Sequence, residues 1–210
     1  MKSSAEHWDR VYESRIEEAL TWFEADPALS FGLVSRFALP GDPVVDVGGG
    51  ASRLVDRLLE AGYGPLTVLD LSATALHASR ERIGARAEAV RWIAADVTEW
   101  TPGGSFALWH DRAVFHFLTE PADRAAYVAT MGRALRSGGI AIIATFADDG
   151  PESCSGLPVM RYSPEALAAE VDSLAPGRFQ PVEAERHSHV TPKGNLQNFQ
   201  VSVFRKTEAG

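Results

Sequence analysis

Two spacings of apolar residues alternate through the middle of the chain. Short continuous apolar runs are typical of strands buried on both faces, and apolar residues repeated every three or four positions are typical of helices with one buried face. The runs predict strands at 44–47, 66–72, 89–97, about 106–110 and 140–147. The helical spacings predict helices at 51–62, at 73–83, from Pro121 to Gly138-Gly139, and at 163–174.

This regular alternation predicts an α/β fold, in which mostly parallel strands form a doubly wound sheet with helices on both faces. The last two predicted strands, 179–190 and 195–206, have no helix between them, so we expect an antiparallel pair at one edge. Residues 1–37 are predicted to be helical, with a break near Asp26-Pro27, and to form an N-terminal lid. Residues 38–210 are predicted to form the domain that contains the sheet.

Composition narrows the possible partners. The 210-residue length favours one domain, and 45% hydrophobic and 23% charged residues are ordinary for a globular protein. The net charge of -8 disfavours a nucleic-acid partner, because an acidic surface repels phosphate backbones. A single cysteine, Cys154, excludes an intrachain disulfide and a cysteine-based zinc site. No apolar run is long enough for a membrane span and residues 1–10 do not resemble a signal peptide, so we expect a cytoplasmic protein.

The first predicted strand runs into three consecutive glycines, Gly48 to Gly50, followed by a helix. A glycine turn between a strand and a helix lets a ligand approach the backbone closely and is typical of nucleotide-type sites. A dinucleotide fingerprint would require a third glycine where this chain has Arg53, and no Gly-Lys-Ser/Thr follows as in a phosphate loop. An NAD-dependent oxidoreductase is therefore an alternative that Arg53 argues against.

Three carboxylates lie at or near the ends of the first three predicted strands: Asp46, Asp70 and Asp96. At the carboxyl edge of an open α/β sheet they would meet around the glycine turn. Asp70 can accept both hydroxyls of a ribose, Asp96 with the Val97 amide can bind an adenine edge, and Asp46 disfavours a pyrophosphate. S-adenosylmethionine, which has adenosine, no phosphate and two cationic groups, fits this set. A non-catalytic cofactor-binding module remains a further alternative.

The series "VVDVGGGAS", "VLDLS", "AADV", "LWHDRAVFHFL" and "LRSGGIAIIATF" resembles the class I, seven-strand methyltransferases in both order and spacing. The resemblance implies the strand order 3-2-1-4-5-7-6, methyl transfer from S-adenosylmethionine to an N, O or S acceptor, and S-adenosylhomocysteine as product. It also implies that the glycine turn contacts the methionine end of the cofactor. The residues assigned to cofactor binding are Trp8, Tyr12, Asp46, Gly48, Gly49, Gly50, Asp70, Leu71, Asp96, Val97, His110 and Arg112.

A narrower resemblance concerns the acceptor. "EHWDRVY" with Trp22-Phe23, "GGGAS" and "HDRAVFHFL" are similar to methyltransferases that modify lysines of translation factors, although these carry Asp-Lys-Gly where this chain has Asp111-Arg112-Ala113. Small-molecule thiol methyltransferases resemble the opening comparably. The expected acceptor is therefore a protein lysine or a small molecule. If it must lose a proton, His116 is the first candidate for the base and Asp111 the second.

Three other groups of residues have competing interpretations. The N-terminal aromatic residues, among them Trp8 and Tyr12, are either packing residues or a lid that excludes water from the cofactor. His187 and His189 share a strand face, but a metal site would need a third ligand that the sequence does not indicate, so no metal is predicted. Cys154 is interpreted as an inert loop thiol, with a substrate-side role as the alternative.

Overall fold

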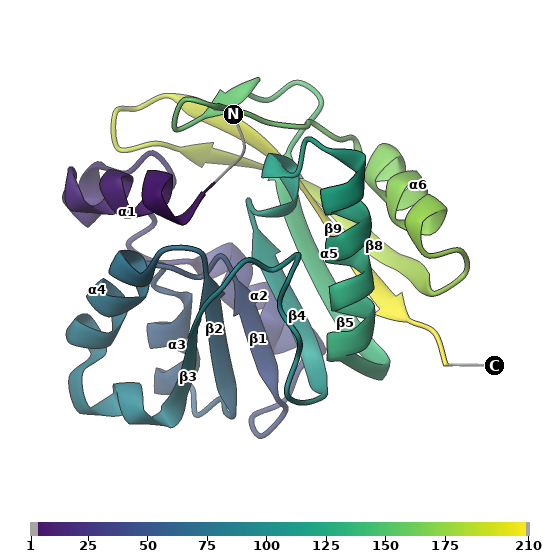
Figure 1. The fold of residues 1–210 in the computed structure, drawn as a ribbon, viewed down its shortest axis with the longest axis horizontal. Helices are drawn as coiled ribbons and strands as arrows, with labels where there is room; N and C mark the ends of the chain where they lie inside the picture. The colour runs from purple at the N-terminus through teal and green to yellow at the C-terminus, as the bar shows by residue number, and fades with distance from the viewer. Residues whose placement is uncertain (1–3, 209–210) are drawn as a thin grey trace.

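The structure is a computed structural model that describes residues 4–208. Its centre is a seven-stranded sheet with helices on both faces (Figure 1). The strands of this sheet are β1 (Val44–Val47), β2 (Leu66–Asp70), β3 (Val90–Ala94), β4 (Phe106–Arg112), β5 (Leu135–Phe146), β8 (Phe179–Val190) and β9 (Leu196–Lys206). A separate two-stranded ribbon pairs β6 (Ser153–Cys154) with β7 (Leu157–Pro158).

Most helices lie in the connections between strands, and the first two α-helices of the described residues precede the first strand. The α-helices are α1 (Ala5–Glu13), α2 (Ala28–Phe37), α3 (Leu54–Glu60), α4 (Ala73–Ile83), α5 (Pro121–Ala134) and α6 (Pro164–Leu174). Three short 3-10 helices are η1 (Glu17–Ala19), η2 (Gly84–Ala89) and η3 (Phe115–Phe117).

The order of strands in the sheet is β3-β2-β1-β4-β5-β9-β8. The first five pair in parallel, and β9 runs antiparallel to both β5 and β8. This confirms the expected fold class and strand order, since β8 and β9 are the sixth and seventh strands of the main sheet. The parallel strands place all their carboxyl ends at one edge, which is where ligands bind in such folds.

Alternate side chains of the central strands pack into two separate hydrophobic cores, one on each face of the sheet. Val45 and Val47 of β1 join a cluster with Tyr127 and Met131 of α5, on one face of the sheet. Val44 joins a second cluster, with side chains of α2, α3 and α4, on the other face. Because successive side chains of a strand point to opposite faces, a continuous apolar run is needed to fill both cores.

Side chains at the helix starts explain several boundaries. The Ser72 hydroxyl accepts a hydrogen bond from the amide of Ala75 at the start of α4. Ser163 does the same for the amide of Ala166 at the start of α6, and Pro121 occupies the first turn of α5. The two serine hydroxyls satisfy amides that have no partner within their own helix, and Pro121 has no amide hydrogen that would need one.

Several boundaries differ from the sequence prediction. The strand predicted at 89–97 ends at Ala94, so Asp96 lies beyond it. The strand predicted at 140–147 begins earlier, at Leu135, and Gly138 lies within it at a positive φ of 72°. The glycine pair therefore does not end α5; it lies where the pairing of β4 with β5 shifts register. In the N-terminal region, α1 has no buried residue, whereas Leu33 and Val34 of α2 belong to the core.

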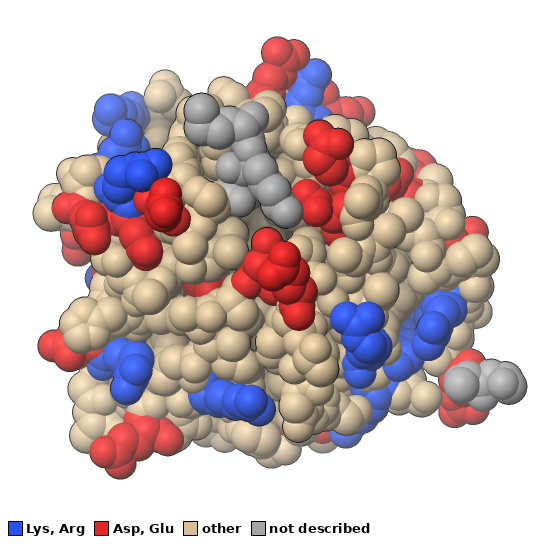
Figure 2. All heavy atoms as spheres, viewed as in Figure 1, with Lys and Arg blue, Asp and Glu red and all other residues tan. Residues whose placement is uncertain are grey.

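The surface charge and the apolar segments of the described residues concern two classes of partner, nucleic acids and membranes. Figure 2 shows acidic and basic side chains interspersed over one face, with no continuous basic surface on the part that it displays. Among residues 4–208 no helix combines the length and the apolar character that crossing a bilayer requires.

Candidate active site

A cavity opens at the carboxyl edge of the sheet, where β1, β2, β3 and β4 end. It contains about 1250 Å³ of empty space, counting its open mouth. Eleven of the twelve residues predicted to bind a cofactor line it: Trp8, Tyr12, Asp46, Gly48, Gly49, Asp70, Leu71, Asp96, Val97, His110 and Arg112. The twelfth, Gly50, does not line the cavity, although the preceding residue, Gly49, does.

The glycine turn has no room for side chains. A Cβ on Gly49 would lie 2.6 Å from Asp46 Oδ2, and one on Gly48 would collide with the Val114 side chain. Gly48 and Gly50 also adopt positive φ angles of 69° and 34°, a region that favours glycine. A Cβ on Gly50 would lie 2.8 Å from Asp70 Oδ2, so this glycine lets Asp70 approach the turn.

Arg53 stands where a dinucleotide fingerprint would have its third glycine. Its Nε lies 3.1 Å from Glu17 Oε1, and its guanidinium lies 5.6 Å from the centre of the Phe23 ring. The side chain thus joins the turn region to the N-terminal segment, which is a use that a glycine could not serve.

Asp46 is buried and only half satisfied. Its Oδ1 lies 2.7 Å from His110 Nδ1, on the paired strand β4. Its Oδ2 has no hydrogen-bond partner among the described residues. A buried carboxylate oxygen without a partner costs free energy, so a ligand donor at this position would be stabilised.

Asp70 ends β2 and faces the same cavity. It accepts a hydrogen bond of 2.7 Å from the amide of Ser72. Burial raises the pKa of the Asp70 carboxyl to about 7, and the negative charge of Asp46 acts in the same direction. A cationic ligand or a pair of hydroxyl donors would favour the ionised form.

Asp96 lies two residues after β3. Its Oδ1 accepts hydrogen bonds from the amide of Thr98, at 2.8 Å, and from the Thr98 hydroxyl, at 2.7 Å. This local turn fixes the position of Asp96, and both Asp96 and the next residue, Val97, line the cavity.

The N-terminal segment covers part of the cavity. Trp8 of α1 packs edge-on against Trp22 and Phe117, with ring centres 5.8 and 5.1 Å apart. Asp9 Oδ1 accepts hydrogen bonds from the Ser72 hydroxyl, at 2.6 Å, and from the Thr74 amide, at 3.1 Å. Since α1 buries no residue in the core, these contacts hold it at the start of α4.

Arg112 ties the end of β4 to two distant parts of the chain. It donates to Glu24 Oε1 at 2.8 Å and to the Trp22 carbonyl oxygen at 3.0 Å. Glu24 Oε1 also lies 3.2 Å from His189 Nδ1 on β8, while His189 Nε2 lies 2.8 Å from the Thr21 carbonyl oxygen. His189 therefore belongs to a polar network behind the cavity.

Asp111, the second candidate base, lies outside the cavity wall and is fully buried. It accepts hydrogen bonds from the Tyr127 hydroxyl, at 2.5 Å, and from the amides of Val114 and Phe115. Burial raises the pKa of Asp111 to about 6, against the effect of these donors. Its contacts link β4 to α5 and fix the loop that follows β4.

His116, the first candidate base, is also fully buried and does not line the cavity. Burial, together with the charge of Arg112, lowers the pKa of His116 to about 3, so the ring is neutral. Its Nδ1 accepts a hydrogen bond of 3.2 Å from the Phe146 amide, which assigns the proton to Nε2. In that tautomer neither nitrogen offers a lone pair to an acceptor.

Several wall residues had no role in the sequence prediction. They include Phe117, Leu118, Asp123, Phe146, Gln197 and Phe199. Phe199 lies in β9, between β5 and the edge strand β8, and reaches the cavity because that strand pairs with β5. Cys154, singled out by its loop position, does line the cavity, and burial raises the pKa of its thiol to about 11. The thiol is thus protonated at neutral pH.

These features fit S-adenosylmethionine. The partnerless Asp46 oxygen and the turn that Cβ atoms would obstruct both offer contacts to a bound molecule. The wall carries several carboxylates and one arginine, which Glu24 neutralises. Such a wall suits a cationic adenosine compound better than a pyrophosphate.

The comparisons with known proteins agree with this geometry. A protein family described as "Methyltransferase domain" matches residues 44–139. The eEF1A lysine and N-terminal methyltransferase of Danio rerio is 30% identical over 151 residues, 70% of this chain and 22% of that protein. This chain spans between 20% and 26% of the length of the curated relatives it matches.

Solved structures share the whole fold. The Burkholderia thailandensis 1,6-didemethyltoxoflavin-N1-methyltransferase, solved with S-adenosylhomocysteine bound, has a TM-score of 0.69 at 26% identity, covering 87% of this chain and 78% of that chain. A structure solved in work on thioacetal formation during echinomycin biosynthesis has a TM-score of 0.75 at 21% identity, covering 97% and 93%.

The fold and the site thus define a class I methyltransferase. The chain belongs to that class and carries an S-adenosylmethionine-dependent methyltransferase domain. None of these findings favours an oxidoreductase or a non-catalytic module.

Proposed function

We propose that this protein transfers a methyl group from S-adenosylmethionine to an amine nitrogen of a protein or small molecule. The observation that carries the proposal is that Asp46, Asp70 and Asp96, from three different strand ends, line one cavity beside a turn without side chains.

Cofactor binding is assigned residue by residue. Asp70 accepts hydrogen bonds from the ribose hydroxyls, and Asp96 with Val97 binds the adenine edge. The turn of Gly48 to Gly50 takes the methionine end, with the partnerless Asp46 oxygen as an acceptor for its ammonium. These assignments follow from the strand ends on which the residues lie.

We assign the acceptor to the aromatic part of the cavity wall. Trp22, Phe117, Phe146 and Phe199 line the cavity, as does Cys154. Aromatic walls desolvate a bound amine and so favour its neutral form, which is the nucleophilic one. The relatives are named as lysine and N-terminal methyltransferases, which supports a nitrogen acceptor.

The mechanism requires mainly alignment. When bound, S-adenosylmethionine supplies an electrophilic methyl group on a sulfonium sulfur. The residues of the wall hold the acceptor in line, and such positioning can contribute about 7–11 kcal/mol. Since Asp111 and His116 lie behind the wall, we propose that the ammonium of the acceptor releases its proton to solvent as it enters and that the desolvating wall keeps the amine neutral without a protein base.

Two measurements test the proposal. Calorimetry with S-adenosylhomocysteine tests the cofactor site, and micromolar binding is expected. Transfer of a labelled methyl group is then compared between peptides with a free N-terminus and lysine, small amines and small thiols. Label on amines supports the proposal; label only on thiols would replace the nitrogen acceptor, and no cofactor binding by the folded protein would refute the function.

A further inference from the structure

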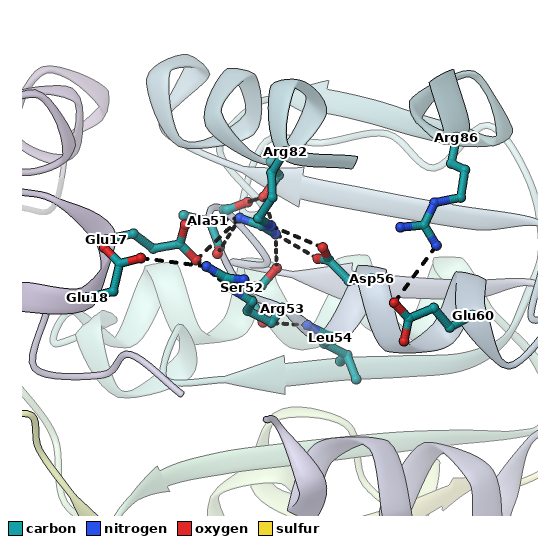
Figure 3. A network of polar contacts seen from close by, with 12 residues as sticks. Glu17, Glu18, Ala51, Ser52, Arg53, Leu54, Asp56, Glu60, Arg82 and Arg86 are labelled. Carbon is teal, nitrogen blue, oxygen red and sulfur yellow. Dashed lines mark hydrogen bonds and ion pairs between the residues drawn. The ribbon is translucent and has the colours of Figure 1, made fainter. Parts of the chain in front are cut away.

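The last turn of α4 carries an arginine that reaches three other segments. The Arg82 side chain is only 16% exposed. It donates to the carbonyl oxygens of Ala51, at 3.2 Å, and Ser52, at 2.8 Å (Figure 3). These two carbonyls directly follow the glycine turn.

A second contact from α4 extends this attachment. The Ser79 hydroxyl donates to the carbonyl oxygen of Gly50 at 2.7 Å, and Arg82 donates to Ser79 Oγ at 3.1 Å. Three consecutive carbonyls, of Gly50, Ala51 and Ser52, are therefore held by side chains of one helix. The positions of these carbonyls fix the backbone conformation of the turn at the cavity wall.

The same guanidinium contacts the N-terminal segment. Arg82 Nη1 lies 3.2 Å from Glu17 Oε2 in η1, and Nη2 lies 2.7 Å from Asp56 Oδ2 in α3 (Figure 3). Glu17 stands in the chain between Tyr12 and Trp22, which both line the cavity. The partly buried Arg82 guanidinium thus connects the N-terminal segment that covers the cavity with the glycine turn.

The Arg82 guanidinium is stabilised in its charged form. Burial opposes ionisation, but the hydrogen bonds and charges of Asp56 and Glu17 outweigh it and raise the pKa of Arg82. Partial burial also reduces screening by salt, so these contacts are stronger than those of an exposed pair.

Arg86, four residues on, provides a matched comparison. Its side chain is 49% exposed and makes a single ion pair of 4.0 Å with Glu60 (Figure 3). Such a pair contributes little, and among residues 4–208 Arg86 makes no hydrogen bond or ion pair with the glycine turn or with η1.

We propose that Arg82 is a positioning residue that couples closure of the N-terminal segment to the conformation of the glycine turn. The inference rests on the proposed function, because the turn matters only if a cofactor binds beside it. Loss of Glu17 in the N-terminal segment should then change the conformation of the glycine turn. Loss of Arg82 should remove the contact through which Glu17 acts on the carbonyls of the turn.

The experiment compares S-adenosylhomocysteine affinity in five proteins: wild type, R82M, E17Q, R86M and the R82M/E17Q double variant. We expect R82M to weaken binding by about tenfold and E17Q by less, as for a coupling of ordinary size. R86M should bind within about twofold of wild type, as expected for an exposed pair. The double variant should bind about as weakly as R82M, because the contact of Glu17 with Arg82 is already lost in R82M. R53M removes the other contact of Glu17, with Arg53.

Hydrogen exchange in the ligand-free protein gives a second readout. E17Q should speed amide exchange in residues 48–53, far more than R86M does, at matched thermal stability. An R53M variant controls for the Arg53 contact of Glu17 and should leave exchange at the turn closer to wild type. E17Q and R53M also keep the test possible if R82M does not fold.

Wild-type affinity in R82M, additive effects in the double variant, or unchanged exchange at the turn in E17Q would each overturn the coupling. If wild type itself binds no S-adenosylhomocysteine, the proposed function fails, while the exchange measurement still decides the coupling.

Discussion

Asp70 shows at the residue scale how binding and stability oppose each other. It lies in a cavity wall where burial and the charge of Asp46 raise its pKa to about 7. A raised pKa in the folded state means that the ionised form costs stability, and this cost grows as the pH rises from about 4, where the unfolded carboxyl ionises, to about 7, above which it is complete. The same ionised form is the better acceptor for ribose hydroxyls.

Asp70→Asn should separate these two effects. The amide keeps an acceptor for the Ser72 amide but loses the charge. We expect S-adenosylhomocysteine to bind more weakly by about 1–3 kcal/mol. The melting temperature of the unliganded protein should rise at pH 8, and this gain should shrink below pH 7 and vanish near pH 4. Calorimetry and thermal melting measure both; equal affinity with a lower melting temperature would contradict the assignment.

The affinity of the wild-type protein should itself depend on pH. If binding requires ionised Asp70, S-adenosylhomocysteine should bind about tenfold more tightly at pH 8 than at pH 6, since most of the carboxyl is protonated at the lower pH. In Asp70→Asn the dependence should be flat across the same range. A wild-type affinity that does not change between these pH values would show that Asp70 is not the titrating acceptor.

At the element scale, α1 is attached by polar contacts rather than by core packing. It has no buried residue, and Asp9 accepts hydrogen bonds from Ser72 and Thr74 at the start of α4. The Ser72 hydrogen bond is the main reason that the pKa of Asp9 is lowered, so Asp9 is ionised at neutral pH. Its charge lies at the N-terminal end of α4, where the helix dipole favours an anion.

Asp9→Ala should therefore loosen α1 without unfolding the sheet. We expect faster amide exchange in residues 5–13 and weaker S-adenosylhomocysteine binding, with a cost to helix docking of about 1–2 kcal/mol. Glu6→Ala, an exposed change in the same helix, is the matched control. Equal exchange in the two variants would show that Asp9 does not hold α1.

At the scale of the whole molecule, the N-terminal region divides into two parts. The segment through η1 contacts the cavity, while Leu33 and Val34 of α2 are buried in the core against β1 and its neighbours. We propose that α2 belongs to the folded domain and that the lid lies before it, rather than ending at residue 37.

Two truncations test this division. Removing residues 1–15 should leave cooperative unfolding intact but weaken S-adenosylhomocysteine binding, because Trp8, Tyr12 and Asp9 are lost. Removing residues 1–37 should abolish cooperative unfolding, because the loss of α2 exposes the apolar side chains of the second core cluster. Circular dichroism melts and calorimetry distinguish the two; a cooperative melt of the shorter protein would place α2 in the lid.

The sequence predicted the sheet, its order and eleven of the residues that line the cavity. Strand ends carry Asp46, Asp70 and Asp96, and parallel strands bring their carboxyl ends together whatever the loops do. Local pattern could not place Asp111, near the end of β4, or His116, just after it, because only packing decides which of these side chains reach the cavity. The sequence did not predict that Phe146 and Phe199 line the cavity, because the pairing of β5 with β9, which are far apart in the chain, brings them to its wall.

By itself, the sequence determined what depends on spacing: apolar periodicity, glycines that allow a tight turn, and acids at strand ends. Only the tertiary structure decided which polar groups meet across long separations. Arg82 lies 31 residues from Ala51 and 65 from Glu17, and no local pattern joins such positions. The physical reason is that secondary structure follows from neighbouring residues, whereas burial, partnership and pKa follow from whatever the folded chain brings into contact.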